Sequence, residues 1–463
     1  MATVNGRVTS TNGTSWSTSG AVPGHVYVPL DFKYQVLSVN LTGKLDFANV
    51  GLMGHSRGGQ GVLAAYNLYR NSSIDSRGIP SPPNTPNINW ASKIPGLNIK
   101  GIFEIGPTDV SLPTSSDGTG SQYLNADGIA WNVLLPMCDG DVYMLDGVRV
   151  FDRTLAFTGP SPIPADTPAT QKSTYTVWGT NHHFYNTEWQ QDDPFGRGCA
   201  GAGNVALFPY PATDGSGSAN QRTTGLASVL AFFRANVGAS ATLSFNQNFD
   251  PRYQLPGAIT SIPARVDEGF TPSPNLSRTK VLFEFLASGW PPGTSTATSS
   301  SAVSLVTGLG VPNHDPSLSA GSVTWNSSSC STYLQINWKD KDTGDNIAGY
   351  QTLDFRVSRQ LDFYKNASAS TSFQIQLIAK DGSDAGAPTG SAVSLNRYIS
   401  LAGPVGIPDV VMPADGIHPI LQTIRIPLTD FMGANLSQIR GVRLIFSDTA
   451  TGAIYVASLR LSN

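Results

Sequence analysis

The sequence has little charge, few cysteines and no long apolar run. Only 13 % of its 463 residues are Asp, Glu, Lys or Arg, and the formal net charge is −3. Such a chain lacks the basic surface that binds phosphate backbones, so we expect no nucleic-acid partner. No apolar run approaches the roughly 20 residues of a membrane-spanning helix, so we expect no transmembrane segment.

The first residues lack the positively charged and apolar regions of a signal peptide. The surface must nevertheless be kept polar mainly by Ser, Thr, Asn, Gln and Gly, as is common in secreted proteins. We therefore expect an extracellular protein whose signal peptide is absent from this sequence. The three cysteines allow one disulfide. We expect it between Cys138 and Cys199, which flank the motifs described below. No Cys/His metal spacing or phosphate loop is present, so no metal and no cofactor is predicted.

The hydrophobic pattern changes near residue 245, in a chain too long for one ordinary core. Before this point, short apolar runs alternate with helical patterns. The runs predict strands at 49–54, 99–107, 130–137 and 172–179, with helices at 58–70 and 221–238. This order predicts an α/β domain over residues 1–244, in which a mostly parallel sheet carries helices on both faces.

The second part, residues 245–463, contains apolar runs separated by turn residues, and several of these runs alternate strictly. This pattern predicts an antiparallel β-sandwich. The expected strands are 279–287, 332–340, 350–358, 372–382, 422–431, 441–448 and 452–462. The Pro/Ser/Thr-rich stretch 290–302 is expected to be an exposed loop.

The segment Gly54-His55-Ser56-Arg57-Gly58 fits the pattern G-x-S-x-G, between an expected strand and an expected helix. In that context a tight turn presents the serine hydroxyl above the sheet edge, and small residues two before and two after avoid clashes. The backbone N–H of Arg57 would then stabilise an oxyanion, helped by the N-terminus of the helix. The alternative is a chance match in a glycine-rich chain.

A serine nucleophile needs a histidine to take its proton and an acid to orient that histidine. The expected order along the chain is serine, acid, histidine. Asp139 and Asp141 follow the expected strand 130–137, and His182 and His183 follow the expected strand 172–179. The alternatives are a turn aspartate and a loop or core histidine. Because the parts occur in the right order, the sequence predicts a Ser-His-Asp triad.

These motifs resemble the α/β-hydrolase superfamily, and within it the dienelactone-hydrolase, cutinase and polyester-hydrolase branch. The resemblance covers roughly residues 30–240 and implies a doubly wound, mostly parallel sheet, with a sheet shortened at its N-terminus as one alternative. It implies that Cys138 takes a small-residue position, that Asp141 is the catalytic acid and that Asp139 is a polarising or capping neighbour. The segment G-x-x-H at 179–182 implies that His182 is the base and His183 the residue behind it.

One departure from this family is the short segment of 55 residues before Ser56. The family usually builds a second oxyanion donor there, and residues 1–25 are the candidate region. Three further side chains, His55, Trp131 and Trp178, are candidates to line an acyl pocket, although tryptophans in such places more often belong to the core.

The pattern of residues 245–463 resembles jelly-roll, galactose-binding-like modules, which implies polysaccharide as a partner of this part. For the whole chain the sequence predicts a serine hydrolase that cleaves carboxylic esters, with polymeric or lipid esters among its candidate substrates. A peptidase or amidase with the same triad, and a degenerate hydrolase that only binds, are the alternatives.

Overall fold

The computed structural model describes residues 7–9, 15–17, 45–70, 96–109, 112–113, 121–122, 124–126, 128–155, 171–187, 219–238, 243–261, 265–272, 279–286, 296–360, 371–401 and 419–463. The chain divides into two compact units, residues 1–48 and 49–463. In the first unit, strands β1 (Arg7–Thr9) and β2 (Ser15–Ser17) pair antiparallel.

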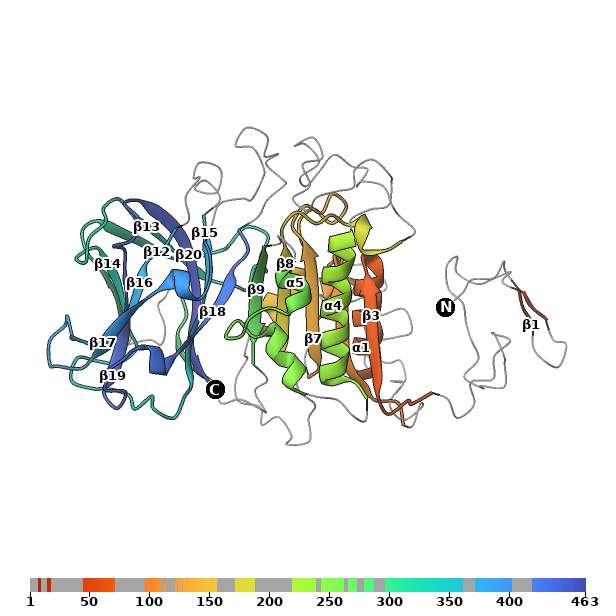
Figure 1. Cartoon of the computed structure of the whole chain (residues 1–463), viewed down its shortest axis with the longest axis horizontal. Coiled ribbons are helices and arrows are strands. Elements are labelled where there is room, and N and C mark those ends of the chain that lie inside the picture. Colours follow the sequence, from red (N-terminus) through yellow and green to blue (C-terminus); the bar gives the residue numbers. More distant parts are fainter. Residues whose placement is uncertain are drawn as a thin grey trace. The chain divides into compact units, whose positions relative to one another are not determined.

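The second unit contains a mixed sheet of five strands (Figure 1), in the order β3-β4-β7-β8-β9. Its strands are β3 (Val50–His55), β4 (Ile99–Ile105), β7 (Ala130–Pro136), β8 (Lys172–Val177) and β9 (Val266–Thr271). The first four run parallel, whereas β9 pairs antiparallel with β8. The carboxyl ends of β3, β4, β7 and β8 therefore share one edge of the sheet.

Helices cover both faces of this sheet. On one face, α1 (Arg57–Arg70) and α3 (Gly147–Leu155) bury Leu63, Tyr66, Val148 and Phe151 against the strands. On the other, α4 (Ala219–Asn236), the 3-10 helix η3 (Leu243–Phe249) and the short α5 (Gly257–Thr260) enclose a second core. Figure 1 shows α4 and α5 in front of the sheet.

The prediction of a doubly wound α/β-hydrolase sheet is wrong. A doubly wound sheet reverses its direction of strand addition at a switch point, but the order of the described strands runs one way, from β3 to β8, and ends on the antiparallel β9. Most strands of the described part belong to antiparallel sheets. Local periodicity predicted where the strands lie but carries no information on their order.

The remaining large sheets pack face to face as an antiparallel β-sandwich, as the sequence predicted. One has the order β12-β13-β20-β15-β18, with β10 also paired to β20, and the other has the order β11-β14-β19-β16-β17. The last strand, β20, lies centrally, between β13 and β15. Apolar side chains from both sheets form one core, which includes Leu334, Phe355 and Ile454.

The sandwich strands have the following bounds: β10 (Lys280–Phe283), β11 (Thr296–Ser299), β12 (Val303–Leu309), β13 (Ala320–Trp325), β14 (Tyr333–Asn337), β15 (Thr352–Arg359), β16 (Gln374–Ala379), β17 (Ala387–Ser394), β18 (Gln422–Pro427), β19 (Ile439–Ile445) and β20 (Gly452–Ser462). The short 3-10 helices are η1 (His183–Tyr185), η4 (Leu395–Arg397) and η5 (Leu428–Asp430). Two further short strands, β5 (Leu112–Pro113) and β6 (Ser121–Gln122), pair with each other.

Buried ion pairs connect the mixed sheet to the sandwich within residues 49–463. Asp152 of α3 accepts hydrogen bonds from His314 Nδ1 at 2.7 Å and from Arg356 at 2.7 Å. Arg153 lies 2.9 Å from Asp315. The predicted domain boundary at 244/245 falls inside this compact unit, and β9, which lies beyond it, belongs to the mixed sheet.

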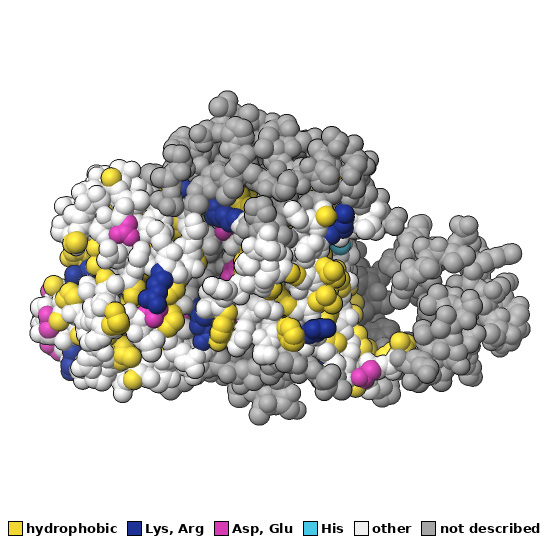
Figure 2. Space-filling model, viewed as in Figure 1, with side chains coloured by type: hydrophobic (Ala, Val, Ile, Leu, Met, Phe, Trp, Pro, Cys, Tyr) yellow, Lys and Arg dark blue, Asp and Glu magenta, His cyan; other side chains and the backbone are white. Residues whose placement is uncertain are grey.

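On the face that Figure 2 shows, the charged side chains of the described residues are scattered rather than gathered into patches. Across the described ranges, no helix is both long enough and apolar enough to span a bilayer.

Candidate active site at the carboxyl edge of the mixed sheet

Ser56 occupies the turn between β3 and α1 in a strained backbone conformation. Its φ of 58° lies in the left-handed region, which non-glycine residues rarely adopt. Two backbone hydrogen bonds of 2.9 Å hold the turn: the Ser56 N–H donates to the Ile105 carbonyl, and the Gly59 N–H donates to the Ser56 carbonyl. Such strain persists only where surrounding structure enforces it, and it is concentrated at functional sites.

The glycines around Ser56 have different roles. A Cβ on Gly54 would overlap the carbonyl oxygen of Gly58, so this position must be glycine. A Cβ on Gly58 would meet nothing within 4 Å, whereas one on Gly59 would lie 2.7 Å from Pro107 Cβ. The close packing of the turn therefore requires glycine at positions 54 and 59. The expectation that Gly58 avoids a clash does not hold.

His182 follows β8 and is hydrogen-bonded to a carboxylate that follows β7. His182 Nδ1 lies 2.8 Å from Asp139 Oδ2, and both side chains are fully buried. The other oxygen, Asp139 Oδ1, accepts the backbone N–H groups of Asp141 at 2.9 Å and Val142 at 2.6 Å. These bonds fix the carboxylate, so Asp139 holds the orientation of the His182 ring.

Asp141, which the family resemblance favoured as the acid, lies on the other side of the ring. Its Oδ2 is 3.6 Å from His182 Nε2, and its side chain is 41 % exposed. His183 is buried at the start of η1, with its ring 5.9 Å from that of His182. The structure thus brings both aspartates and both histidines to one edge of the sheet.

His55, the residue before Ser56, lies against His182. The two ring centroids are 4.5 Å apart, and His55 Nε2 lies 3.0 Å from the His182 carbonyl oxygen, to which it can only donate. Burial, together with the nearby His182 ring, lowers the pKa of His55 to about 4, against the opposing effect of this hydrogen bond. His55 is therefore neutral at physiological pH. Its hydrogen bond connects the turn that holds Ser56 to the segment that holds His182.

Gly106 is a residue of this site that the sequence analysis missed. It follows β4 with a φ of 45°, and a Cβ there would lie 3.1 Å from both Asp139 Oδ2 and His182 Nδ1. Any side chain would press on this hydrogen bond. The available signal was a glycine close to the carboxyl end of the expected strand 99–107.

The two tryptophans that were candidates for an acyl pocket lie in the core. Trp131 is 0 % exposed and donates from Nε1 to Glu104 at 2.7 Å. Trp178 is 1 % exposed and donates to Asp267 at 2.8 Å. Burial raises the pKa of Glu104 to about 8, against the lowering effect of the Trp131 hydrogen bond. Glu104 is therefore protonated at neutral pH.

Several predicted features fall partly outside the described residues. Arg57 begins α1 and is exposed, which places its backbone N–H at the helix N-terminus. The candidate second oxyanion donor in residues 1–25 and the cysteine Cys199 lie outside the described residues, so the pairing with Cys138 stays a prediction. Cys330 is free and exposed. Within the described ranges, no group of three His, Cys, Asp or Glu side chains could hold a metal ion.

No family model matches the chain. No curated protein matches it either. Several solved structures are similar to about two fifths of the chain.

A family 11 carbohydrate-binding module of a cellulosomal cellulase from Clostridium thermocellum is 13 % identical, over 40 % of this chain and 93 % of that one, with a TM-score of 0.25. A family 30 carbohydrate-binding module of another cellulosomal cellulase from Clostridium thermocellum is 11 % identical, over 39 % of this chain and 96 % of that one, with a TM-score of 0.26. A β-1,2-glucanase from Parabacteroides distasonis is 17 % identical, over 39 % of this chain and 24 % of that one, with a TM-score of 0.25. Similarity at this level identifies no family for the chain.

Proposed function

We propose that this protein is a serine hydrolase that cleaves carboxylic esters. The observation that carries the proposal is the hydrogen bond between His182 and Asp139, at the sheet edge where the β3–α1 turn holds Ser56 at a φ of 58°. The contact between the His55 and His182 rings supports it, because it joins the two segments that would have to cooperate. An activated serine needs a base and a group that orients the base.

In this mechanism, Ser56 Oγ attacks the carbonyl carbon of the ester while His182 Nε2 takes the hydroxyl proton. His182 then gives this proton to the leaving alcohol oxygen, and an acyl-enzyme remains. Water, deprotonated by His182, hydrolyses the acyl-enzyme and restores the serine. Asp139 accepts the hydrogen bond from Nδ1 and stabilises the imidazolium, a role that the sequence resemblance gave to Asp141.

The tetrahedral intermediate carries a negative charge on the former carbonyl oxygen. Arg57 is the first residue of α1, so its backbone N–H lies at the helix N-terminus, where the helix dipole also favours an anion. We assign the Arg57 N–H as one oxyanion donor.

The choice of an ester over an amide rests on the sequence resemblance described above. As part of the proposal, the enzyme is secreted, acts on polymeric or lipid esters, and contacts polysaccharide through its β-sandwich.

The test is hydrolysis of p-nitrophenyl esters from acetate to palmitate by the wild-type protein and by Ser56→Ala. We expect the variant to lose roughly 10³-fold or more in rate. Ser331→Ala, an exposed serine of the sandwich, serves as the matched control and should keep full activity.

Two results would contradict the proposal. Faster cleavage of fluorogenic peptides than of any ester would indicate a peptidase or amidase. Failure of a fluorophosphonate to label Ser56 in a folded protein, together with no ester cleavage, would indicate a non-catalytic binding protein.

A further inference from the structure

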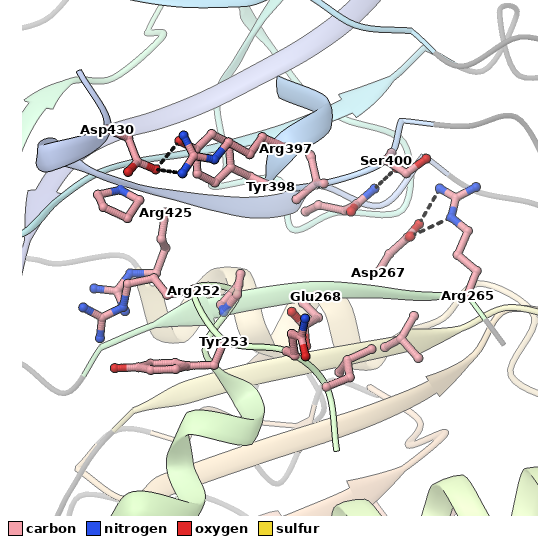
Figure 3. Close-up of a pocket in the computed structure, with 17 residues that line it drawn as sticks. Arg252, Tyr253, Arg265, Asp267, Glu268, Arg397, Tyr398, Ser400, Arg425 and Asp430 are labelled. Atoms are coloured by element: carbon pink, nitrogen blue, oxygen red, sulfur yellow. Dashed lines mark hydrogen bonds and ion pairs between the residues drawn. The ribbon is translucent and has the colours of Figure 1, made fainter. Parts of the chain in front are cut away.

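A polar pocket of about 550 Å³ lies where the mixed sheet meets the sandwich. One wall is formed by residues 251–255 and the first half of β9, and the other by residues 397–400, β18 and Asp430 (Figure 3). Its volume falls in the range of small-molecule sites. Because β3, which precedes Ser56, and β9, which lines this pocket, are the two ends of the described sheet, these two strands are about 19 Å apart.

The guanidinium groups of the pocket are all paired with carboxylates. The pairs are Arg265 with Asp267, Arg397 with Asp430, and both Arg252 and Arg425 with Asp250. Figure 3 shows the first two pairs on opposite walls. An anionic ligand would have to compete with these carboxylates, and a cationic ligand would have to compete with the guanidinium groups, so the lining favours a ligand without charge.

Glu268 adds an uncharged hydrogen-bonding group to the β9 wall, with its side chain drawn in the middle of Figure 3. Burial, together with the neighbouring Asp250 and Asp267, raises the pKa of Glu268 to about 8. Among the described residues, no hydrogen bond or ion pair reaches its carboxyl group. A protonated carboxyl can donate one hydrogen bond and accept others, which matches a hydroxyl group of a ligand.

Two tyrosines supply flat apolar surface to the same pocket, one on each wall. Tyr253 is 44 % exposed. The Tyr398 hydroxyl donates to Asp430 at 2.6 Å, which fixes its ring. Aromatic rings with a polar handle suit ligands that carry apolar faces and hydroxyl edges together. Sugar rings have both.

We propose that this pocket binds a short, uncharged oligosaccharide. Three features favour such a ligand: the paired charges of the lining, the Glu268 carboxyl group, which has no partner among the described residues, and the two tyrosine rings. Binding here does not require ester cleavage at Ser56.

Isothermal titration calorimetry with cellotetraose, xylotetraose and mannotetraose tests the proposal, with tetragalacturonate and chitosan tetraose as charged probes. We expect at least one neutral probe to bind, with an affinity that changes less than twofold between 50 and 500 mM NaCl. Tyr253→Ala should weaken this binding at least tenfold. Tyr333→Ala, on the other sandwich sheet, should leave it unchanged. The proposal is overturned if only charged probes bind, if none binds, or if Tyr253→Ala binds as well as the wild type.

A pH series tests the role of Glu268. A bound neutral ligand removes water from the carboxyl group and so favours its protonated form, which means that binding should weaken as the pH rises through about 8. Glu268→Gln should bind equally at pH 6 and pH 9. The charged and titratable groups around Glu268 and across the pocket are Tyr175, Asp250, Arg252, Tyr253, Arg265, Asp267, Arg397, Tyr398, Arg425 and Asp430. The same pH dependence in wild type and Glu268→Gln would contradict the assigned role.

Ser56→Ala separates this inference from the proposed esterase activity. It should abolish ester cleavage and leave oligosaccharide binding unchanged. Tyr253→Ala should weaken oligosaccharide binding and leave the cleavage of p-nitrophenyl acetate unchanged. A wild-type protein without esterase activity that still binds a neutral probe would refute the proposed function and support the pocket. An active esterase that binds none of the neutral probes would support the proposed function and refute the proposal for the pocket.

Discussion

Two carboxylates two residues apart contact different nitrogens of His182. Asp139 lies at Nδ1, whereas Asp141 lies at Nε2 and is 41 % exposed. The sequence placed both after the same strand, and the spacing of a known family favoured Asp141. In the turn after β7, the N–H groups of Asp141 and Val142 donate to the Asp139 carboxylate and hold it in place. Backbone hydrogen bonds of this kind cannot be read from residue spacing.

The pair Asp139→Asn and Asp141→Asn tests the roles of the two carboxylates. We expect Asp139→Asn to lower kcat/KM for p-nitrophenyl acetate by about 10³-fold or more, since an amide favours the wrong tautomer of His182. Asp141→Asn should cost less than tenfold. Equal losses, or a larger loss for Asp141→Asn, would give the orienting role to Asp141.

His55 makes the stability of the protein depend on pH. Its pKa is about 4 in the folded protein and 6.5 in a model peptide, so the unfolded chain binds more protons between these values. The contribution of neutral His55 is therefore complete above pH 6.5 and is lost as the pH falls towards 4, by up to about 3 kcal/mol. Urea unfolding of wild type and His55→Gln at pH 7.5 and pH 4.5 measures this effect. The variant should lose less stability on acidification; equal losses would contradict the prediction.

Most elements around the site could be predicted from hydrophobic periodicity, and those that were missed have weak signals. The expected strands 99–107, 130–137 and 172–179 correspond to β4, β7 and β8. Strand β11 lies in a Ser/Thr-rich stretch that was expected to be a loop, and it has no buried residue. Its backbone pairing with β14, rather than its side chains, makes it a strand.

The strand-to-helix turn at Ser56 offers a matched pair of glycines. Gly54→Ala should lower the free energy of unfolding by about 2–4 kcal/mol, because its Cβ would overlap the Gly58 carbonyl. Gly58→Ala meets nothing within 4 Å and should leave stability unchanged or raise it by up to about 1 kcal/mol. Urea denaturation provides both values. A Gly58→Ala variant as unstable as Gly54→Ala would contradict this account of the turn.

At the scale of the whole molecule, the sequence predicted the sandwich but not the arrangement of the first sheet. The doubly wound prediction followed from strand–helix alternation, which leaves the order of strands open. Strand β9 joins the sheet from residues 266–271, beyond the change in pattern near residue 245. Long-range pairings of this kind depend on packing between distant segments.

Asp152 connects the two parts through His314 and Arg356, and its removal tests that connection. Burial alone would raise the pKa of Asp152, but His314 and Arg356 lower it to about 2. Asp152→Ala leaves both partners buried without their carboxylate and should cost about 3–5 kcal/mol of stability.

The control is Arg149→Ala, on the same helix, which removes a partly exposed ion pair with Asp146 and should cost at most about 1 kcal/mol. Chemical denaturation followed by circular dichroism compares the two variants. Equal stabilities of the two variants would show that the Asp152 contacts do not hold the parts together.

The central place of β20 has a consequence for biosynthesis. Strand β20, residues 452–462, pairs with β13, β15 and β10. During translation, its neighbours leave the ribosome while their shared partner is still being made. The sandwich sheet therefore closes only after residue 462 has emerged, and until then the edges of β13, β15 and β10 that face β20 are open to pairing with other strands.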